Sequence, residues 1–214
     1  GLSDAYIVAG GGAYISPERA HPLAEAAAKK ALELDESSAE AHVSLATVRF
    51  MHYEWPEAEQ EFRRALALNP NYATSHHWYA LHLAALGRNT EAIEHARRAQ
   101  LLDPLSLVIT ANAGWCYFFA RQYDLAIEQS RRALDLDPSF DSAYAYMGFA
   151  YLEKRMATEA LAAFRKAQEL SGGTGYYPEL ASAYAVFGQK KEALRLLAEF
   201  QERAGREPVS AYDV

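Results

Sequence analysis

The sequence predicts an all-α fold, a solenoid of about six antiparallel helix pairs, and three observations support this prediction. The sequence repeats with a period of 34 residues, apolar residues recur at helical spacing within each repeat, and proline or glycine marks four of the five repeat boundaries. One leucine per repeat shows the period: Leu34, Leu68, Leu102, Leu136 and Leu170. Because one such repeat cannot bury its apolar face alone, neighbouring repeats have to stack to form the core.

Alanines keep the same period at two further places. The first place holds Ala24, Ala58, Ala92, Ala126 and Ala160, and the second holds Ala31, Ala65, Ala99, Ala133 and Ala167. A third place holds glycine in two repeats, at Gly114 and Gly148. Helix axes approach more closely where the side chains in contact are small. These places therefore predict the contact lines between packed helices.

Each repeat predicts two helices joined by a short turn. In the repeat from Asp141, the string DSAYAYMGFAYLEKR carries small and aromatic residues at helical spacing, and TEALAAFRKAQEL carries apolar residues at i, i+3, i+4 and i+7. Pro70, Pro104 and Pro138 end the second helix of their repeats. The repeats begin near residues 5, 39, 73, 107, 141 and 175, so residues 1–214 are predicted to form a single solenoid, which we expect to be part of a longer protein.

The first and last repeats depart from this pattern. Gly10, Gly11 and Gly12 lie inside the first predicted helix. Each glycine costs a helix about 1 kcal/mol relative to alanine, so fraying or loose packing is expected there. The last repeat is one residue short after Gly188, and its start, SGGTGYYP, predicts an irregular segment.

The composition argues against several classes of function. Of the 214 residues, 50% are apolar and 23% are charged, which suits a folded domain. The net charge of −7 argues against nucleic acid as a partner, and no apolar run reaches the roughly 18 residues of a membrane span. The single cysteine, Cys116, fits a reducing compartment, so a cytoplasmic protein is expected. The sequence contains no phosphate-binding loop or nucleophile motif, so neither enzymatic activity nor a cofactor is predicted.

The repeat pattern resembles the tetratricopeptide-repeat family over nearly the whole chain. The repeat from Leu107 to Phe140 matches the family's pattern at Gly114, Tyr117, Ala126, Ala133 and Pro138. The resemblance implies a right-handed superhelical solenoid that acts as a scaffold for protein–protein interaction. The string YATSHHWYALHLAALGR also resembles repeat modules that bacteria attach to winged-helix regulators, protein kinases and nucleotide cyclases, which implies a signalling context.

In this family the first helix of each repeat lines a concave groove, and this defines the predicted partner site. Its residues are Val43, Thr47, Phe50, Met51, His77, Trp78, Leu81, Asn112, Trp115, Phe118, Phe119, Tyr146 and Phe149. Such an aromatic, almost uncharged surface is typical of partner binding, so a protein partner or a peptide with apolar side chains is expected. The alternative is that some of these rings pack between neighbouring first helices.

The sequence bears on two other functions of such a fold. Some family members grip C-terminal carboxylates with Lys, Arg and Asn, but here the matching places hold Ala9, Ala13, Ser44, Thr74 and Trp78, which argues against that mode. The second function is structural: a homo-oligomer that forms through the apolar ends of the solenoid within a larger regulatory protein.

The stretch ATSHHWYALHLAALG holds three of the seven histidines. A helical zinc site needs two ligands at i, i+3 or i, i+4 on one face, with further ligands nearby. His77 and His82 are five positions apart, and Leu81 fills the i, i+4 place, so no metal site is predicted. His76 and His82 are expected to pack in the interior, and His77 to lie in the groove.

Basic doublets keep the period on the second helices: Lys29–Lys30, Arg63–Arg64, Arg97–Arg98, Arg131–Arg132 and Arg165–Lys166. A ladder of this kind can bind phosphates. Acidic residues stand four positions before several of these bases, at Glu25, Glu59, Glu94 and Glu128. Because i, i+4 ion pairs stabilise helices, a solvated face with intrahelical pairs is predicted.

Overall fold

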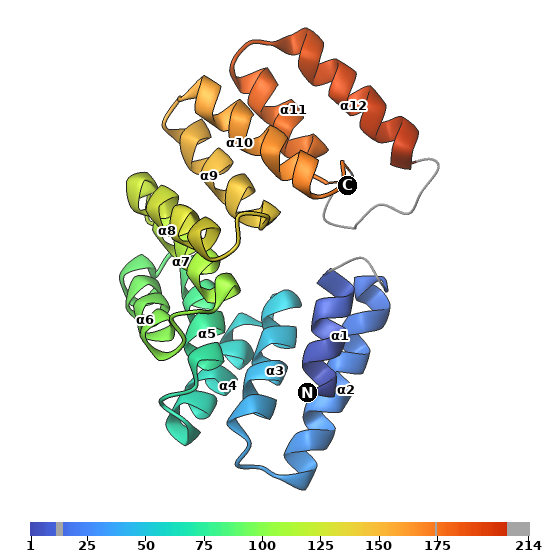
Figure 1. The fold of residues 1–214 in the computed structure, drawn as a ribbon. Coiled ribbons are helices and arrows are strands. Elements are labelled where there is room, and N and C mark those ends of the chain that lie inside the picture. The colour runs from blue at the N-terminus through green and yellow to red at the C-terminus, as the bar shows by residue number, and fades with distance from the viewer. Residues whose placement is uncertain (12–14, 174, 205–214) are drawn as a thin grey trace. The chain divides into compact units, whose positions relative to one another are not determined.

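The computed structural model describes residues 1–11, 15–173 and 175–204, and all regular secondary structure in these ranges is helical (Figure 1). Twelve helices follow one another in the described ranges, and consecutive helices pack as antiparallel pairs. The predicted all-α fold of about six helix pairs is confirmed. The chain divides into two compact units, Gly1–Pro104 and Leu105–Val214, which we call the N-terminal and C-terminal units.

Each unit contains three helix pairs. The helices of the N-terminal unit are α1 (Leu2–Gly11), α2 (Pro17–Leu34), α3 (Ala39–Met51), α4 (Trp55–Leu68), α5 (Ala73–Ala85) and α6 (Asn89–Leu102). Those of the C-terminal unit are α7 (Leu107–Phe119), α8 (Tyr123–Leu136), α9 (Asp141–Glu153), α10 (Ala157–Leu170), α11 (Tyr177–Val186) and α12 (Lys190–Ala204). None of these helices has the length and apolar character needed to cross a membrane.

A residue with positive φ closes the turn inside five of the helix pairs. These residues are Tyr53 (62°), Gly87 (75°), Arg121 (58°), Arg155 (60°) and Gly188 (77°). The next backbone N–H donates to the carbonyl five positions back, as from Arg88 to Leu83 at 2.9 Å, which is a common way to end a helix. Glycine adopts this conformation without steric strain, whereas other residues do so at a cost of about 1 kcal/mol.

Glycine at the third repeated place brings helices close together in two of the repeats. A Cβ on Gly148 of α9 would lie 2.7 Å from the ring of Phe164 in α10, which is fully buried. A Cβ on Gly114 of α7 would lie 3.3 Å from the carbonyl oxygen of Ala126 in α8. A larger residue at position 148 would therefore clash with an aromatic ring. A larger residue at position 114 would make a less severe contact with the backbone.

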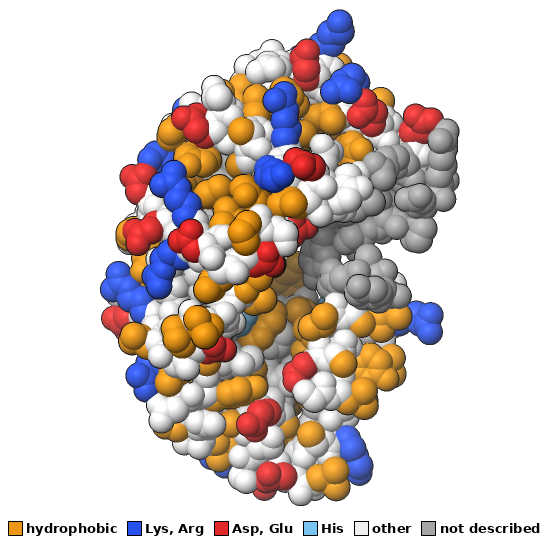
Figure 2. Space-filling model, viewed as in Figure 1, with side chains coloured by type: hydrophobic (Ala, Val, Ile, Leu, Met, Phe, Trp, Pro, Cys, Tyr) orange, Lys and Arg blue, Asp and Glu red, His pale blue; other side chains and the backbone are white. Residues whose placement is uncertain are grey.

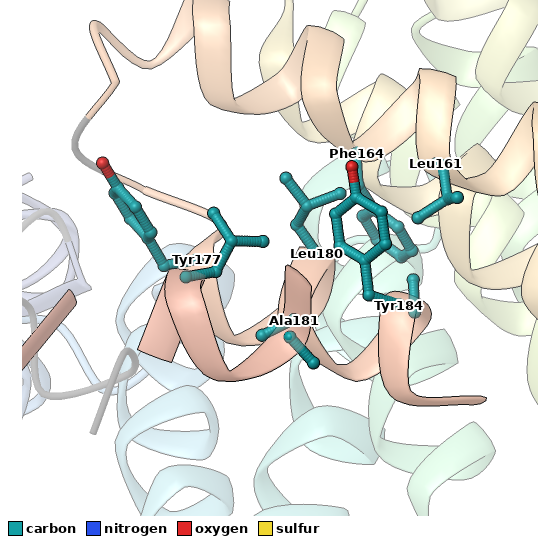
Figure 3. Packing of buried hydrophobic residues seen from close by; sticks show 9 residues of the cluster. Leu161, Phe164, Tyr177, Leu180, Ala181 and Tyr184 are labelled. Carbon is teal, nitrogen blue, oxygen red and sulfur yellow. The ribbon is translucent and has the colours of Figure 1, made fainter. Parts of the chain in front are cut away.

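The core of the C-terminal unit links α10 to the last helix pair. Figure 3 shows Leu161 and Phe164 of α10 facing Leu180 and Tyr184 of α11. All four side chains are buried. The guanidinium of Arg165 lies 5.5 Å from the centre of the Tyr184 ring and donates a hydrogen bond to its hydroxyl. Burial of these apolar groups stabilises the contact between neighbouring repeats, as the repeat pattern predicts.

The two unusual ends of the sequence have different outcomes. The first helix ends at its glycines, because the described part of α1 stops at Gly11, but the expected loose packing is wrong at Gly10, where a Cβ would lie 2.7 Å from the Cβ of Ala20. Gly12 lies outside the described residues. The irregular start of the last repeat is confirmed: Gly172, Gly173 and Tyr176 all have positive φ, and α11 begins only at Tyr177.

Candidate partner-binding surface

Five aromatic rings of α7 and α9 form a continuous cluster in the C-terminal unit. Trp115 is at its centre, and its ring centre lies 4.7 Å from Tyr146, 5.1 Å from Phe118, 5.4 Å from Phe149 and 5.7 Å from Phe119. We call these five residues the α7–α9 aromatic surface. All five belong to the predicted groove, and the structure places their rings next to one another.

The α7–α9 aromatic surface is anchored on one side and accessible on the other. Phe149 meets the buried ring of Phe164 edge to face, with 5.1 Å between ring centres. Phe119 is 51% exposed, and Trp115 and Phe118 are partly exposed. The rings are thus held by the core and still present apolar area to solvent.

Polar groups border this surface. The hydroxyl of Tyr146 donates to Oδ1 of Asn112 at 3.2 Å, and burial raises the pKa of Tyr146, so the phenol remains a neutral donor. On the other side, Phe118 contacts the ring of Tyr123 with 5.7 Å between centres. Tyr123 lines a cavity of 350 Å³, whose other lining residues are Arg121, Gln122, Asp124, Leu125 and Lys154. Apolar contact area and hydrogen-bonding groups therefore lie next to one another.

Three of the seven predicted lining residues of the N-terminal unit are buried. Val43 is 3% exposed and Thr47 is 1% exposed, and the hydroxyl of Thr47 donates to the Val43 carbonyl at 2.8 Å. His77 is 6% exposed, and burial lowers its pKa to about 4. These three side chains cannot contact a partner in this conformation, which corrects their assignment to the groove. The reason is that the neighbouring helices cover them, as the alternative interpretation expected.

The remaining predicted residues of the N-terminal unit are partly exposed. They are Phe50, Met51, Trp78 and Leu81. Phe50 is held by edge contacts with Trp55 and His82, at 6.4 and 5.7 Å between ring centres. They do not form a ring cluster comparable to the α7–α9 aromatic surface in the contacts described, and their role in binding stays a prediction.

His82 packs in the interior, as predicted. It is fully buried, and its ring lies 5.6 Å from Phe62, 6.1 Å from Tyr79 and 6.3 Å from Trp55, measured between centres. Burial lowers its pKa, and neither ring nitrogen has a hydrogen-bond partner among the described residues. This environment suits a neutral imidazole that acts as an apolar ring.

His76 forms a hydrogen-bonded pair with His95 of α6. The two Nδ1 atoms are 2.8 Å apart, and Nε2 of His76 lies 3.1 Å from the carbonyl oxygen of Pro70. The carbonyl requires a proton on Nε2 of His76, so His95 must donate through its Nδ1–H. Burial and the neighbouring His76 lower the pKa of His95 to about 4. In the described part of the chain, no group of three or more His, Cys, Asp and Glu residues could hold a metal.

The basic doublets lie mostly among acidic and polar partners. Glu25 pairs with Lys29 at 2.6 Å and Glu59 with Arg63 at 2.7 Å, as predicted. Arg98 instead donates to Oδ1 of Asn71, at 2.6 Å. On the face seen in Figure 2, basic and acidic side chains are interleaved. This arrangement fits the predicted solvated face.

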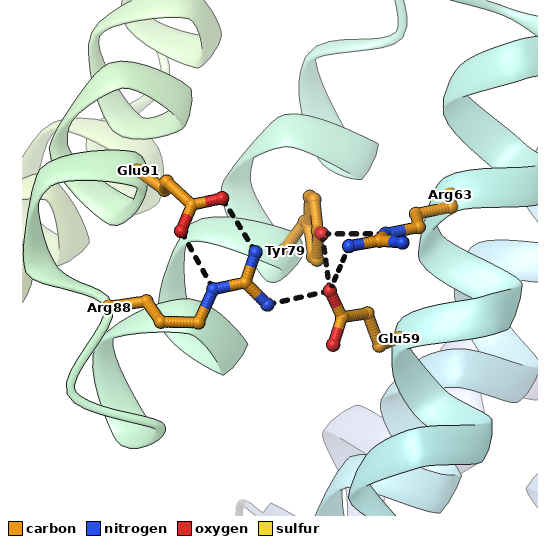
Figure 4. A network of polar contacts seen from close by, with 5 residues as sticks. All are labelled: Glu59, Arg63, Tyr79, Arg88 and Glu91. Atoms are coloured by element: carbon orange, nitrogen blue, oxygen red, sulfur yellow. Dashed lines mark hydrogen bonds and ion pairs between the residues drawn. The ribbon is translucent and has the colours of Figure 1, made fainter.

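Glu59 is the centre of a network that joins three helices of the N-terminal unit (Figure 4). Its Oε1 accepts hydrogen bonds from Arg63 at 2.7 Å, Tyr79 at 3.0 Å and Arg88 at 2.6 Å. Arg88 also donates twice to Glu91, at 2.8 and 2.6 Å. Burial acts to raise the pKa of Glu59, but the hydrogen bonds from Arg88 and Tyr79 outweigh it and lower the pKa. The network fixes α4, α5 and the start of α6 to one another.

Sequence reasoning missed the contact between His21 of α2 and His52, which follows α3. Nδ1 of His21 lies 3.2 Å from Nε2 of His52. The two residues are 31 positions apart, so neither the 34-residue period nor helical spacing relates them. Only the packing of α2 against α3 reveals this pair.

Comparison with known proteins identifies the repeat. The family model described as tetratricopeptide repeat matches residues 17–73, 52–106 and 112–173. No curated protein matches the chain in sequence.

Solved structures show the same fold. PilW, described as a widely conserved type IV pilus biogenesis factor, is 21% identical with a TM-score of 0.77, over 97% of this chain and 92% of that chain. A thermophilic TPR protein of Thermus thermophilus is 20% identical with a TM-score of 0.71, over 79% and 93%. YrrB, described as a TPR protein with an unusual peptide-binding site, is 20% identical with a TM-score of 0.55, over 87% and 96%. At these identities the likeness shows the fold alone.

Proposed function

Because the chain belongs to the tetratricopeptide-repeat family, we propose that it is a non-enzymatic protein-interaction module whose α7–α9 aromatic surface binds a partner. The observation that carries the proposal is the cluster of five rings around Trp115, of which Phe119 is half exposed. Aromatic side chains that are held rigidly and remain accessible contribute most of the binding energy at protein interfaces. The partner is a peptide segment or a domain that offers apolar side chains.

The polar border supports a peptide as the occupant. A bound peptide chain needs hydrogen-bond partners for its backbone as well as apolar contacts for its side chains. Tyr146 is one of the five rings, and its hydroxyl lies 3.2 Å from the side-chain amide oxygen of Asn112, so both polar groups stand at the edge of the surface. The description of YrrB as a peptide-binding TPR protein agrees with this class of ligand on the same fold.

The test is selection of peptides from a displayed random library, followed by affinity measurement on single-residue variants. Trp115→Ala is expected to weaken binding about 30-fold, the effect of removing a central aromatic anchor. Phe119→Ala should weaken it by a smaller factor because this ring is already half exposed.

The matched control is Leu101→Ser, because Leu101 is 75% exposed but lies in the N-terminal unit, away from the five rings in sequence. Circular dichroism shows whether each variant keeps its helices. If Trp115→Ala stays folded and binds the selected peptides as tightly as the wild type, the α7–α9 aromatic surface is not the binding site.

A second proposal is self-association through the last helix pair. Leu194 and Leu197 of α12 are 56% and 41% exposed, and Val186 of α11 is 44% exposed. A second copy that packed on these side chains would remove apolar area from water. Light scattering over a range of concentrations measures the molecular mass of the wild type and of Leu194→Ser. If both remain monomeric at high concentration, the proposal is contradicted.

A further inference from the structure

The contact between His21 and His52 has the geometry of two ligands of one metal ion. In a tetrahedral zinc site with Zn–N bonds of about 2.0–2.1 Å, two ligand nitrogens lie about 3.3–3.4 Å apart. Nδ1 of His21 and Nε2 of His52 are 3.2 Å apart. The two nitrogens are thus already spaced nearly as a tetrahedral ion requires.

The other histidine pair of the N-terminal unit provides an internal comparison. In a straight N–H···N hydrogen bond, two imidazole centres are separated by the N···N distance plus about 2.3 Å, the sum of two ring radii. His76 and His95 come close to this, with 2.8 Å between nitrogens and 5.0 Å between centres. For His21 and His52 the nitrogens are 3.2 Å apart and the ring centres are 5.1 Å apart. The ring centres are thus closer than a straight arrangement would place them, so the two rings are bent relative to the line between their nitrogens. Two imidazoles that bind one ion are bent in this way.

The surroundings of the pair suit a cation. A neutral imidazole has one ring nitrogen with a free lone pair, and this lone pair is what binds a metal. Two carboxylates, Glu18 and Glu25, lie on α2 three residues before and four residues after His21. The charge of Glu18 acts on His21. Glu25 is influenced most by Lys29, with which it forms an ion pair at 2.6 Å, and also by His52 and Arg49. His52 is exposed, so an ion can enter from solvent.

We propose that Nδ1 of His21 and Nε2 of His52 bind a divalent first-row transition metal such as Zn²⁺ or Co²⁺. Imidazole nitrogen is a ligand that these ions favour. The described residues supply two side-chain ligands, and water fills the other positions. With half of the usual ligand set, a dissociation constant of about 1–100 μM is expected. The bound ion ties α2 of the first helix pair to the end of α3 in the second.

The test is calorimetric titration of the untagged full chain with ZnCl₂ at pH 7.5, repeated with Co²⁺ to record its visible spectrum. One equivalent is expected to bind, with spectral bands that show nitrogen ligation. His21→Gln and His52→Gln should each weaken binding at least 10-fold. His95→Gln is the matched control, because it removes an imidazole from the straight pair and should leave the affinity unchanged.

Thermal unfolding provides a second measurement. Zn²⁺ at about ten times its dissociation constant should raise the melting temperature of the wild type by about 3–5 °C, and this shift should vanish in His52→Gln. His52 is exposed, so this variant keeps the test valid even if His21→Gln does not fold. Absence of binding by the wild type at 1 mM Zn²⁺ (about ten times the weakest expected dissociation constant) overturns the proposal. So does equal binding by the His21→Gln, His52→Gln double variant.

Discussion

The two units are built on the same repeat but differ in the chemistry of the contacts between their helices. All seven histidines of the chain lie in the N-terminal unit, and the C-terminal unit has none. In the N-terminal unit His42 contacts Glu61 at 2.6 Å between Nδ1 and Oε2, and one period later His76 contacts His95. The small residues of the repeat fix how the helices pack, while these variable places decide whether histidine forms part of the contact between the helices.

The C-terminal unit uses the corresponding places differently. One period after His76 and His95 stand Thr110 and Gln129, and a further period on stand Tyr144 and Ala163. None of these four side chains is a histidine or a carboxylate. The lesson is that one backbone arrangement accommodates contacts with or without histidine and carboxylate groups, without a change of fold.

The largest effect that tests this comparison is loss of a core ring in either unit. Phe62 of α4 and Phe164 of α10 occupy the same repeat place, and both are fully buried. Phe62→Ala and Phe164→Ala should each lower the unfolding free energy of its own unit by about 3–5 kcal/mol. Hydrogen exchange with mass spectrometry reports the two units separately. Equal loss of protection in both units from one substitution would show that the units do not unfold independently.

Acid should destabilise the N-terminal unit first. The pKa of His77 is about 4 in the folded chain, below the value of about 6.5 for an unfolded chain, so the unfolded chain binds more protons between these values. The stability from His77 is therefore complete above about pH 6.5 and is lost as pH falls toward 4, by about 2 kcal/mol at pH 4.5. His95 acts in the same direction.

Hydrogen exchange at pH 6.5, 5.5 and 4.5, corrected for intrinsic rates, measures this effect. The C-terminal unit, without histidine, should keep its protection between pH 6.5 and 5.5, and His77→Leu should reduce the pH dependence of the N-terminal unit. A decline of both units in parallel over this range, unaffected by His77→Leu, would contradict the assignment.

A smaller effect is expected at the conserved glycine place of the C-terminal unit. Gly148→Ala puts a methyl group 2.7 Å from the buried ring of Phe164 and should cost about 1–3 kcal/mol. Gly114→Ala, with its nearest contact at 3.3 Å, should cost less. Urea unfolding of the two variants gives the comparison, and a larger loss for Gly114→Ala than for Gly148→Ala would refute this ranking.

The smallest effect concerns the turns. Arg121 adopts φ of 58° at the place where Gly87 stands in the N-terminal unit. Arg121→Gly should raise stability by about 0.5 kcal/mol, because relief of the left-handed strain exceeds the entropy that glycine loses. Gly87→Ala should lower it by about 1 kcal/mol. The urea midpoints of Arg121→Gly and Gly87→Ala measure these changes in stability. Changes of opposite sign to those expected would show that side-chain contacts, not φ, control these turns.

The sequence predicts the helices well because the period and the small residues act locally. Ala39, Ala73, Leu107 and Asp141 begin helices one period apart. The last repeat is one residue short, as predicted, but the missing residue lies before Gly188 and not after it, because Gly188 has the positive φ that the period would place one residue later. The period therefore predicts where the helices begin, whereas the exact place of the shortening needs the backbone conformation.

The candidate site was only partly predictable because exposure depends on neighbouring helices. The places in the repeat predict the rings around Trp115, whereas the hydrogen bond from Tyr146 to Asn112, one period apart, is known only from the structure. Burial of Val43 and Thr47 could not be read from those places, because it depends on how closely the neighbouring helices approach. The His21–His52 contact lies off the period and needs the three-dimensional arrangement of α2 and α3.

The convergence of three donors on one oxygen of Glu59 has a consequence for ionic strength. Two of the three donors are guanidinium groups, and the side chain of Arg63 is 64% exposed, so dissolved ions screen part of the attraction. The bond from Tyr79 is between a neutral hydroxyl and the carboxylate, and it is less affected by salt. In concentrated salt the Arg63 contact therefore weakens first, and Tyr79 becomes the more important tie between α4 and α5.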